Sequence, residues 1–410
     1  MKTKFCLLVS FLLIGISSFA ENDTTEVSTT NYHRDYTLLY SPNYDMLNSS
    51  ENSRTAAKML IDAYWRGIGP KIKNKTIGSI SGFLWTFATT WSATLWPHEY
   101  GHKLRALQIG GDFHIEKFSF PVAFGRFELP ENVTLEDETL IIIGGIEANS
   151  MMSRDVINDL YKYGGLYNDE LFTGFFNRLI WPTYSLMLRF DVDDPASWID
   201  ENGDPMCFGD AACFAKFVWE MGGNEFFMND GSINPSFVSF YHQLGIIGLA
   251  WNLVDLNFYR GAKAIASGEL NGQKPKYLLG DESNGWAYST LFNTSVLGAE
   301  LYLNNYLKIQ NQLYSIYLKY GFPLENNGIG ITAYNVIDLP RFKSDLTIEG
   351  WKQKFYGTGI SATTTLSFSL SKKFDILAQA GWKSKGYVLG RPLDEGFVGF
   401  AGLRYKMFGL

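Results

Sequence analysis

The sequence predicts an α+β protein, in which a helical region is followed by an antiparallel, barrel-like β-rich region. Apolar residues recur mostly at helical spacing between residues 51 and 280, and they alternate with a period of two after residue 285. Of the 410 residues, 46% are hydrophobic, 16% aromatic and only 19% charged, so the chain can bury a large core. A net charge of −7 argues against the basic surface of a nucleic-acid-binding protein.

The N-terminal residues 1–20 have the pattern of a secretory signal peptide. Lys2 and Lys4 precede an apolar run over 5–16, and small residues follow this run. The run is short for a membrane span, although a retained anchor is the alternative. Residues 21–50 are polar and lack periodicity, so we expect a leader without fixed structure. The chain is therefore expected to be exported, to the outer membrane or the periplasm.

Helical spacing marks several segments of the first region. The predicted helices are 54–65, 77–96, 135–163, 170–190 and 236–266, with a short hairpin over 112–128. Segment 77–96 has about the length of a membrane span, but it carries several Ser and Thr hydroxyls. A membrane span and a buried helix therefore both stay open for 77–96, and also for 236–258.

Alternating residues mark strands in the second region. In the clearest strand, 358–370, the side chains of Ile360, Leu366 and Phe368 share one face, and small polar residues share the other. Such strands are typical of an outer-membrane β-barrel, although a soluble antiparallel sheet gives the same alternation. The further predicted strands are 295–303, 307–319, 328–338, 374–383 and 397–408.

Residues 98–102 read His-Glu-Tyr-Gly-His, and this motif carries the strongest chemical prediction. Four residues apart on a helix, His98 and His102 project from one face and can supply two nitrogen ligands to a zinc ion. Glu99 lies beside that position without needing to bind the metal, so it can act as general base toward the attacking water. The alternative is a pair of histidines that only cap or pack the helix.

A catalytic zinc site needs a third protein ligand and an open position for water. We predict Glu147 as this ligand, because it follows the apolar stretch 140–146 and a buried carboxylate needs a partner. The alternative for Glu147 is a surface position on an amphipathic helix. Asp255 is the second candidate, although a salt bridge with Arg260 would also explain an acidic residue there.

The remaining histidines and the cysteines give weaker predictions. His114, expected on the hairpin, and His242 could orient a substrate or stabilise an oxyanion. A histidine such as His242 is more often a hydrogen-bonded core residue. In an exported protein, Cys207 and Cys213 are expected to form one short disulfide, and two free thiols are the alternative.

The histidine motif, with Glu147 on a following helix, resembles the gluzincin metallopeptidases. The resemblance implies that His98, His102 and Glu147 bind zinc and that Glu99 is the catalytic base.

The longer string also resembles the site-2 protease family of intramembrane zinc peptidases. The shared features are the short motif, a Phe-containing hairpin over 118–127 and a Gly-x-x-x-Asn helix, matched by Gly145 to Asn149. This resemblance implies Asp255 as the third ligand. The chain departs from that family at this position, because Asp255 is followed by Leu256 and not by the usual Gly. Both resemblances fall within residues 75–260.

We therefore predict a zinc-dependent peptidase of the cell envelope. Its helical domain, 51–280, would carry the chemistry, and its β domain, 285–410, would hold it in or next to the outer membrane. The expected cofactor is Zn²⁺, and the expected partners are a peptide or protein substrate and a membrane. The first alternative is a non-enzymatic outer-membrane β-barrel or structural envelope protein. The second is a site-2-like intramembrane protease, in which 77–96 and 236–258 would span a bilayer.

Overall fold

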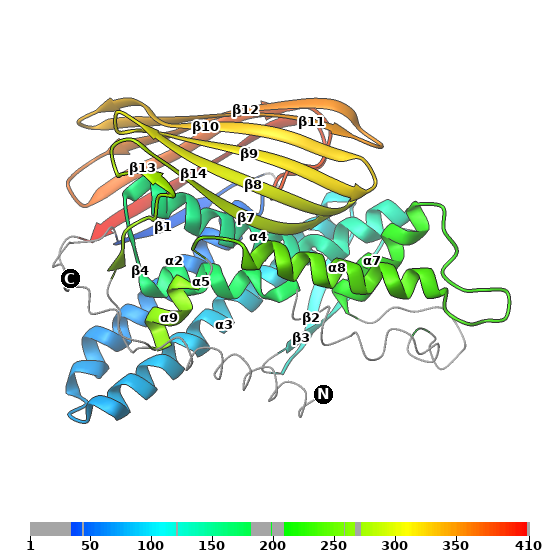
Figure 1. Ribbon diagram of the computed structural model, residues 1–410, viewed down its shortest axis with the longest axis horizontal. Helices are drawn as coiled ribbons and strands as arrows, with labels where there is room; N and C mark the ends of the chain where they lie inside the picture. Colours follow the sequence, from blue (N-terminus) through cyan, green and yellow to red (C-terminus); the bar gives the residue numbers. More distant parts are fainter. Residues whose placement is uncertain are drawn as a thin grey trace.

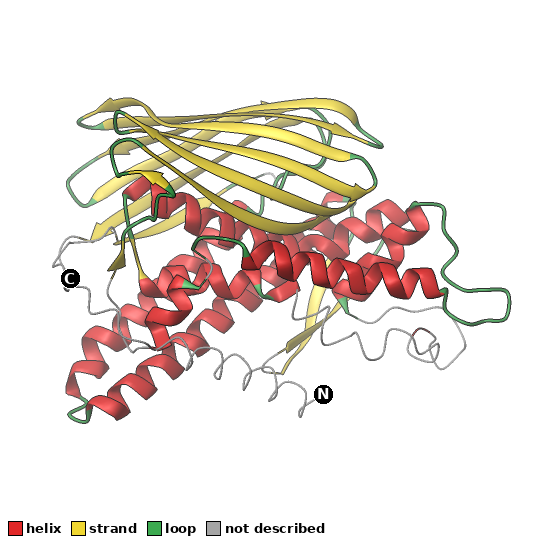
Figure 2. Cartoon of the chain, viewed as in Figure 1, coloured by secondary structure: helices red, strands yellow, loops and turns green. Residues whose placement is uncertain are grey.

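A computed structural model of the chain shows a layer of helices beneath one large antiparallel sheet (Figures 1 and 2). The α+β class predicted from the sequence is confirmed. The expected signal peptide, half of the polar leader and Cys207 lie outside the described residues. The structure describes residues 34–42, 45–119, 122–181, 198, 209–257, 259–266 and 272–407.

Helix α4 begins and ends at residues that are usual signals for helix ends. In α4 the side chain of Thr134 accepts from the backbone of Asp137 and Asp137 reciprocates, and the helix ends at Gly164 in the left-handed conformation. The segment predicted as one helix over 236–266 is divided into α8 and α9. The helices are α2 (Leu47–Ala63), α3 (Lys75–Gln108), α4 (Leu135–Tyr163), α5 (Asn168–Arg178), α7 (Asp210–Met221), α8 (Pro235–Leu253) and α9 (Arg260–Ala266).

The large sheet has ten strands in the order β1-β14-β13-β12-β11-β10-β9-β8-β7-β6. Its two end strands, β1 and β6, are not hydrogen-bonded to each other, so the described strands form an open sheet rather than a closed barrel. The hairpin predicted over 112–128 is confirmed as β2 (Asp112–Ser119) and β3 (Val122–Glu128). The strands of the large sheet are β1 (Arg34–Tyr40), β6 (Leu279–Gly280), β7 (Gly285–Ser295), β8 (Gly298–Ile309), β9 (Gln312–Pro323), β10 (Asn326–Leu339), β11 (Phe342–Gln353), β12 (Gly357–Ser369), β13 (Phe374–Lys383) and β14 (Gly396–Met407).

Strand β1 comes from the segment 21–50 that we expected to lack fixed structure. It pairs along its whole length with the C-terminal strand β14, from Arg34 opposite Met407 to Tyr40 opposite Ala401. The two sequence regions are therefore joined through the N-terminal strand, which completes the C-terminal sheet.

The large sheet has its polarity reversed relative to a soluble sheet. On the strand predicted over 358–370, Ile360 and Phe368 point outward and are exposed, whereas Ser361 and Thr363 point inward and are buried. Residues directly opposite each other share a face, so the registers extend this pattern across neighbouring strands. We call the exposed side the outer face; its exposed apolar residues are Leu38, Tyr40, Leu318, Tyr320, Ile329, Ile331, Leu346, Ile348, Ile360, Phe368, Phe374, Ile376, Trp382, Phe397 and Leu403.

The inner side of the sheet faces α2 and α4 across a charged chamber. This cavity has a volume of about 190 Å³. Its charged groups are largely paired, for example Arg54 with Asp159 at 2.6 Å and Arg404 with Asp35 at 3.0 Å. The charged residues that line it are Asp35, Glu51, Arg54, Asp155, Asp159, Lys162, Asp345 and Arg404.

The free edge of β1 is covered by side chains of α2. Asn52 accepts from the backbone N–H of Leu39 (2.8 Å) and donates to its carbonyl (3.0 Å). Thr55 makes the same pair of bonds with Thr37, at 2.9 and 2.7 Å. These side chains satisfy backbone groups that an exposed edge strand would leave open.

None of the helices in the described part of the chain is long and apolar enough to cross a bilayer.

Candidate metal centre

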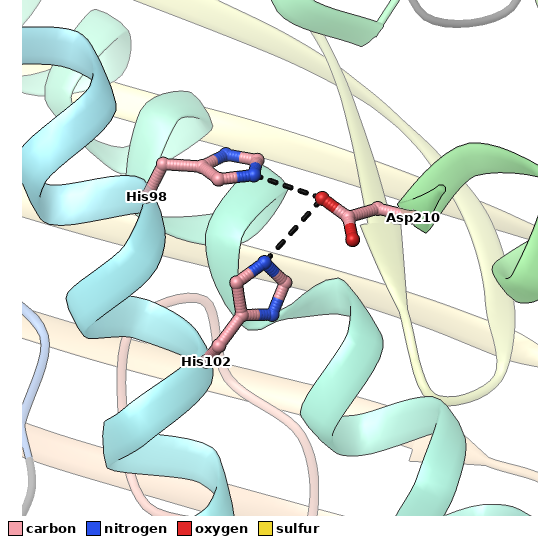
Figure 3. A group of neighbouring side chains, drawn as sticks. All are labelled: His98, His102 and Asp210. Carbon is pink, nitrogen blue, oxygen red and sulfur yellow. Dashed lines mark hydrogen bonds and ion pairs between the residues drawn. The ribbon is translucent and has the colours of Figure 1, made fainter. Parts of the chain in front are cut away.

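Helices α3 and α7 bring two histidines and one aspartate together (Figure 3). His98 and His102, one turn apart on α3, direct their Nε2 atoms at Oδ2 of Asp210, at 2.8 and 3.3 Å. Ligand atoms of these three residues all lie within 4.8 Å of one another, and they are the one such group among the described residues. Asp210 is the first residue of α7. The predicted histidine pair is therefore joined by an acid that sequence reasoning missed.

The opposite nitrogen of each imidazole has a fixed partner. His98 Nδ1 lies 2.8 Å from Asn149 Oδ1, and His102 Nδ1 lies 2.8 Å from the carbonyl oxygen of Ile141. The amide nitrogen of Asn149 donates to the carbonyl of Thr94 at 3.0 Å, so its oxygen faces His98. Both Nδ1 atoms must then carry a proton, so each Nε2, which faces the carboxylate, is the nitrogen that can offer its lone pair to a metal ion. Metal-binding histidines are held in this way.

Glycines allow α4 to lie directly against the motif. A Cβ atom on Gly101 would fall 2.2 Å from the carbonyl oxygen of Gly144, and one on Gly145 would fall 2.6 Å from Nε2 of His98 and of His102. Any larger residue would separate the helices or displace the imidazoles. The same close approach places Asn149 and Ile141, both on α4, behind the two histidines.

The centre is buried and attracts positive charge. His98, His102 and Glu99 are each less than 8% exposed. Burial lowers the pKa of His102, but the Asp210 carboxylate outweighs it and raises that pKa to about 9. Burial raises the pKa of Asp210, but the two histidines outweigh it and the net shift is downward. The three groups therefore favour a positive charge between them: a proton on His102 supplies it here, and a metal ion would supply it in place of that proton.

Glu99 lies beside this group with its carboxylate uncommitted. It is 7% exposed, and the described residues give its carboxylate no hydrogen-bond partner. The aromatic rings of Phe113 and Phe127, from the β2–β3 hairpin, lie 5.8 and 6.0 Å from the His102 ring. A buried carboxylate next to an enclosed centre is placed to accept a proton from a bound water.

Glu147, the third ligand expected from the sequence, is not brought to the histidines. Its carboxylate accepts three hydrogen bonds from Nε and Nη2 of Arg105, the shortest at 2.6 Å, and one from the backbone N–H of Gly390 at 2.7 Å. Both side chains of the pair are fully buried. The expectation that a buried carboxylate needs a partner is met, but the partner is a guanidinium one turn beyond His102.

Asp255, the second candidate, is also remote from the centre. Its Oδ2 pairs with Arg178 at 2.6 Å and accepts the backbone N–H of Thr290 at 2.9 Å. Ser289 donates to the same oxygen. Asp255 therefore satisfies a backbone N–H group on the free edge of β7. The alternative pairing with Arg260 is not formed; Arg260 donates to Asn257.

The weaker sequence candidates lie outside the centre. His114 is on the exposed hairpin and lies 3.5 Å from Asp112. His242 is on α8, and its Nε2 is buried without a hydrogen-bond partner among the described residues. Cys213 is disulfide-bonded, whereas Cys207 lies outside the described residues.

Comparisons with known proteins give no family. No protein-family model matches the chain, and no curated protein matches it. Two solved structures have weak similarity. A bacterial polysaccharide outer membrane secretin is 14% identical with a TM-score of 0.20; the match covers 32% of this chain and 53% of the secretin, about half its length. A heparan sulfate lyase HepC mutant from Pedobacter heparinus is 9% identical with a TM-score of 0.15, over 89% of this chain and 73% of the other.

Proposed function

We propose that the chain is a zinc-dependent peptidase of the cell envelope, with His98, His102 and Asp210 as metal ligands and Glu99 as general base. The observation that carries the proposal is the convergence of two Nε2 atoms on one carboxylate, with both Nδ1 atoms hydrogen-bonded to groups on α4. Two imidazoles and a carboxylate suit zinc, and three protein ligands leave a fourth position for water or substrate.

Each residue around the centre has a separate role in the proposed hydrolysis. A zinc ion held there would polarise the scissile carbonyl and lower the pKa of water in the fourth position. Glu99 accepts a proton from the attacking water while the oxygen of that water bonds to the carbonyl carbon. The same carboxyl then gives the proton to the leaving nitrogen when the C–N bond breaks. Asn149 and the carbonyl of Ile141 keep the two imidazoles in their metal-binding orientation.

Two observations support the location in the cell envelope. The sequence begins with the pattern of a secretory signal, and Cys213 is disulfide-bonded, as is usual in oxidising compartments. An exported protein or peptide is therefore the proposed substrate. The site-2-like alternative requires Asp255 at the metal, but that carboxylate is bound to Arg178.

The first experiment is the metal content of the purified protein, compared with a His98→Ala, His102→Ala double variant. We expect about one zinc per chain, lost in the double variant. Glu99→Gln is the matched control: it should retain zinc and lose peptidase activity on unfolded protein substrates by about 10²-fold or more. Absence of zinc after zinc is supplied would overturn the proposal, and so would full activity of Glu99→Gln in a metal-loaded protein.

A further inference from the structure

The outer face of the large sheet is apolar over seven neighbouring strands, β1 and β9 to β14. Its exposed apolar side chains are between 39% and 72% exposed. Together they present roughly 1,000 Å² or more, whereas the largest apolar patch of a soluble monomer is usually about 300–600 Å². Buried charged side chains point the other way, among them Asp375 and Lys383 on β13. A sheet in water has the opposite polarity.

The two ends of the outer face differ from its middle. Where β13 pairs with β14, Phe374 lies opposite Tyr405 at one end, and Trp382 lies opposite Phe397 at the other. Between them the outward residues are aliphatic or small, such as Ile376 opposite Leu403. Aromatic residues at both ends of an aliphatic band are typical of a surface that crosses a bilayer, because their rings favour the interface with water.

Lysines on the outer face also lie at the ends of the strands and not in the middle. On β11 the outward Leu346 and Ile348 precede Lys352, which is exposed near the strand end and pairs there with Glu325 at 2.8 Å. The turn after β12 carries the exposed pair Lys372 and Lys373. Cations at the ends of an apolar surface complement lipid phosphates at the edge of the hydrocarbon layer.

The backbone groups at the edges of the sheet also have hydrogen-bond partners, which a nonpolar solvent requires. A lipid-exposed edge strand would leave backbone groups without partners, at several kcal/mol each. Asn52 and Thr55 satisfy these groups on β1, and Asp255 accepts the N–H of Thr290 on β7. The open sheet therefore does not require an aqueous edge at these positions.

We propose that the outer face is embedded in the acyl chains of a lipid bilayer, with the charged chamber on its protein side. A second copy of the chain fits the surface less well. The sheet arches over α4, with β7 in front and β13, β14 and β1 behind (Figure 1), so the outer face is convex. Two convex faces touch along a narrow strip, whereas a stable dimer buries more than about 1,000 Å². The inference is independent of the metal centre.

The test places a fluorescent label on the full-length chain in phosphatidylcholine vesicles, through cysteines introduced by Ile376→Cys and Leu403→Cys. These residues face each other on the outer face, so each serves as a second site if the other variant misfolds. Lys372→Cys, in the turn next to β13, is the matched control. Vesicles with acyl chains brominated near their centre should quench the labels at 376 and 403 and spare the label at 372. Aqueous iodide should do the reverse.

Two results would overturn the proposal. Labels at 376 and 403 that iodide quenches as strongly as the label at 372, without an effect of brominated lipid, would place the outer face in water. Labels protected from both quenchers, in a protein that sediments as a dimer, would assign the outer face to a second copy. As a label-free measurement, Ile376→Lys should reduce vesicle binding about 30-fold or more, and Glu282→Gln, at an exposed position between β6 and β7 and away from the outer face, should leave it unchanged.

Discussion

Asn149 determines which nitrogen of His98 faces the centre. Its oxygen accepts the Nδ1 proton, and its amide nitrogen is held by the carbonyl of Thr94 and by Asn177. Loss of such a partner frees the imidazole to rotate and to exchange tautomers, which usually weakens metal binding about 10- to 100-fold.

The first prediction concerns this hydrogen bond. Asn149→Ala should lower zinc affinity about 10- to 100-fold, as measured by competition with a chelator. Asn158→Ala is the matched control, because Asn158 lies on the same helix but bonds Tyr306 in the sheet. Equal zinc affinities for the two variants would contradict the role assigned to Asn149.

The second prediction separates two buried acids. Glu147→Ala leaves Arg105 as an unpaired buried charge, so it should reduce the free energy of unfolding by about 3–5 kcal/mol and retain zinc. Asp210→Ala should have the opposite balance: greatly weakened zinc binding with a smaller loss of stability, because the Asp210 side chain is 18% exposed. Urea unfolding and zinc titration of both variants test this. A folded Glu147→Ala protein without zinc affinity would show that the assignment is reversed.

At the metal centre, the sequence could predict the residues whose relation is local. His98, Glu99 and His102 lie within one and a half turns of a single helix, so spacing alone predicts their arrangement. Asp210 lies 112 residues beyond His98 and has no local marker other than its place at the start of a helix. Glu147 was correctly identified as an acid that needs a partner. Whether that partner is Arg105 or a metal ion depends on how α3 packs on α4, which the sequence alone does not show.

At the scale of elements, the metal centre depends on how closely α3 and α4 approach. The third prediction is that Gly145→Ala abolishes zinc binding, because the new methyl group would meet both imidazoles at 2.6 Å. It should also cost about 1–3 kcal/mol of stability, as overpacking usually does. Gly67→Ala, where a methyl group meets nothing within 4 Å, is the control and should leave zinc content unchanged. Normal zinc content in Gly145→Ala would contradict the packing described.

Strand prediction succeeded where alternation was undisturbed. Strand β13 was predicted with its observed bounds, and β12 was predicted one residue late, because apolar and polar residues alternate cleanly there. Strand β11 was missed because its inward positions carry charges, such as Asp345, which pairs with Lys162 in the chamber. β1 was missed because its pairing partner β14 lies at the other end of the chain. The alternation alone left open whether the apolar side of the sheet points outward, as in a membrane barrel, or inward, as in a soluble sheet.

At the scale of the whole molecule, the charged chamber makes stability depend on pH. Burial raises the pKa of Glu51 to about 7 and that of Asp155 to about 6, in spite of the nearby arginines that lower both. At these two groups the folded protein therefore binds more protons than the unfolded chain between pH ~4 and ~7. The stability from these two groups is fully present below their unfolded pKa values and is lost as the pH rises through 6 and 7.

The fourth prediction follows from this sign. A Glu51→Gln, Asp155→Asn double variant should be more stable than the native chain at pH 8, by on the order of 2 kcal/mol, and should lose that advantage at pH 4–5. Denaturant unfolding across this pH range measures the difference. The exposed variant Glu282→Gln is the control and should follow the native curve. A double variant that is less stable at pH 8 would show that the two carboxylates are needed in their charged form.

The pairing of β1 with β14 sets the order in which the molecule can be completed. Arg34 pairs with Met407, so this contact joins the two ends of the described part of the chain. Contacts of such separation form slowly, because the loop between them must first be closed. The helices of the metal centre all lie within that loop, so they can pack before β14 has paired with β1. The sheet acquires its last strand, and the chamber its final wall, only when β1 and β14 meet.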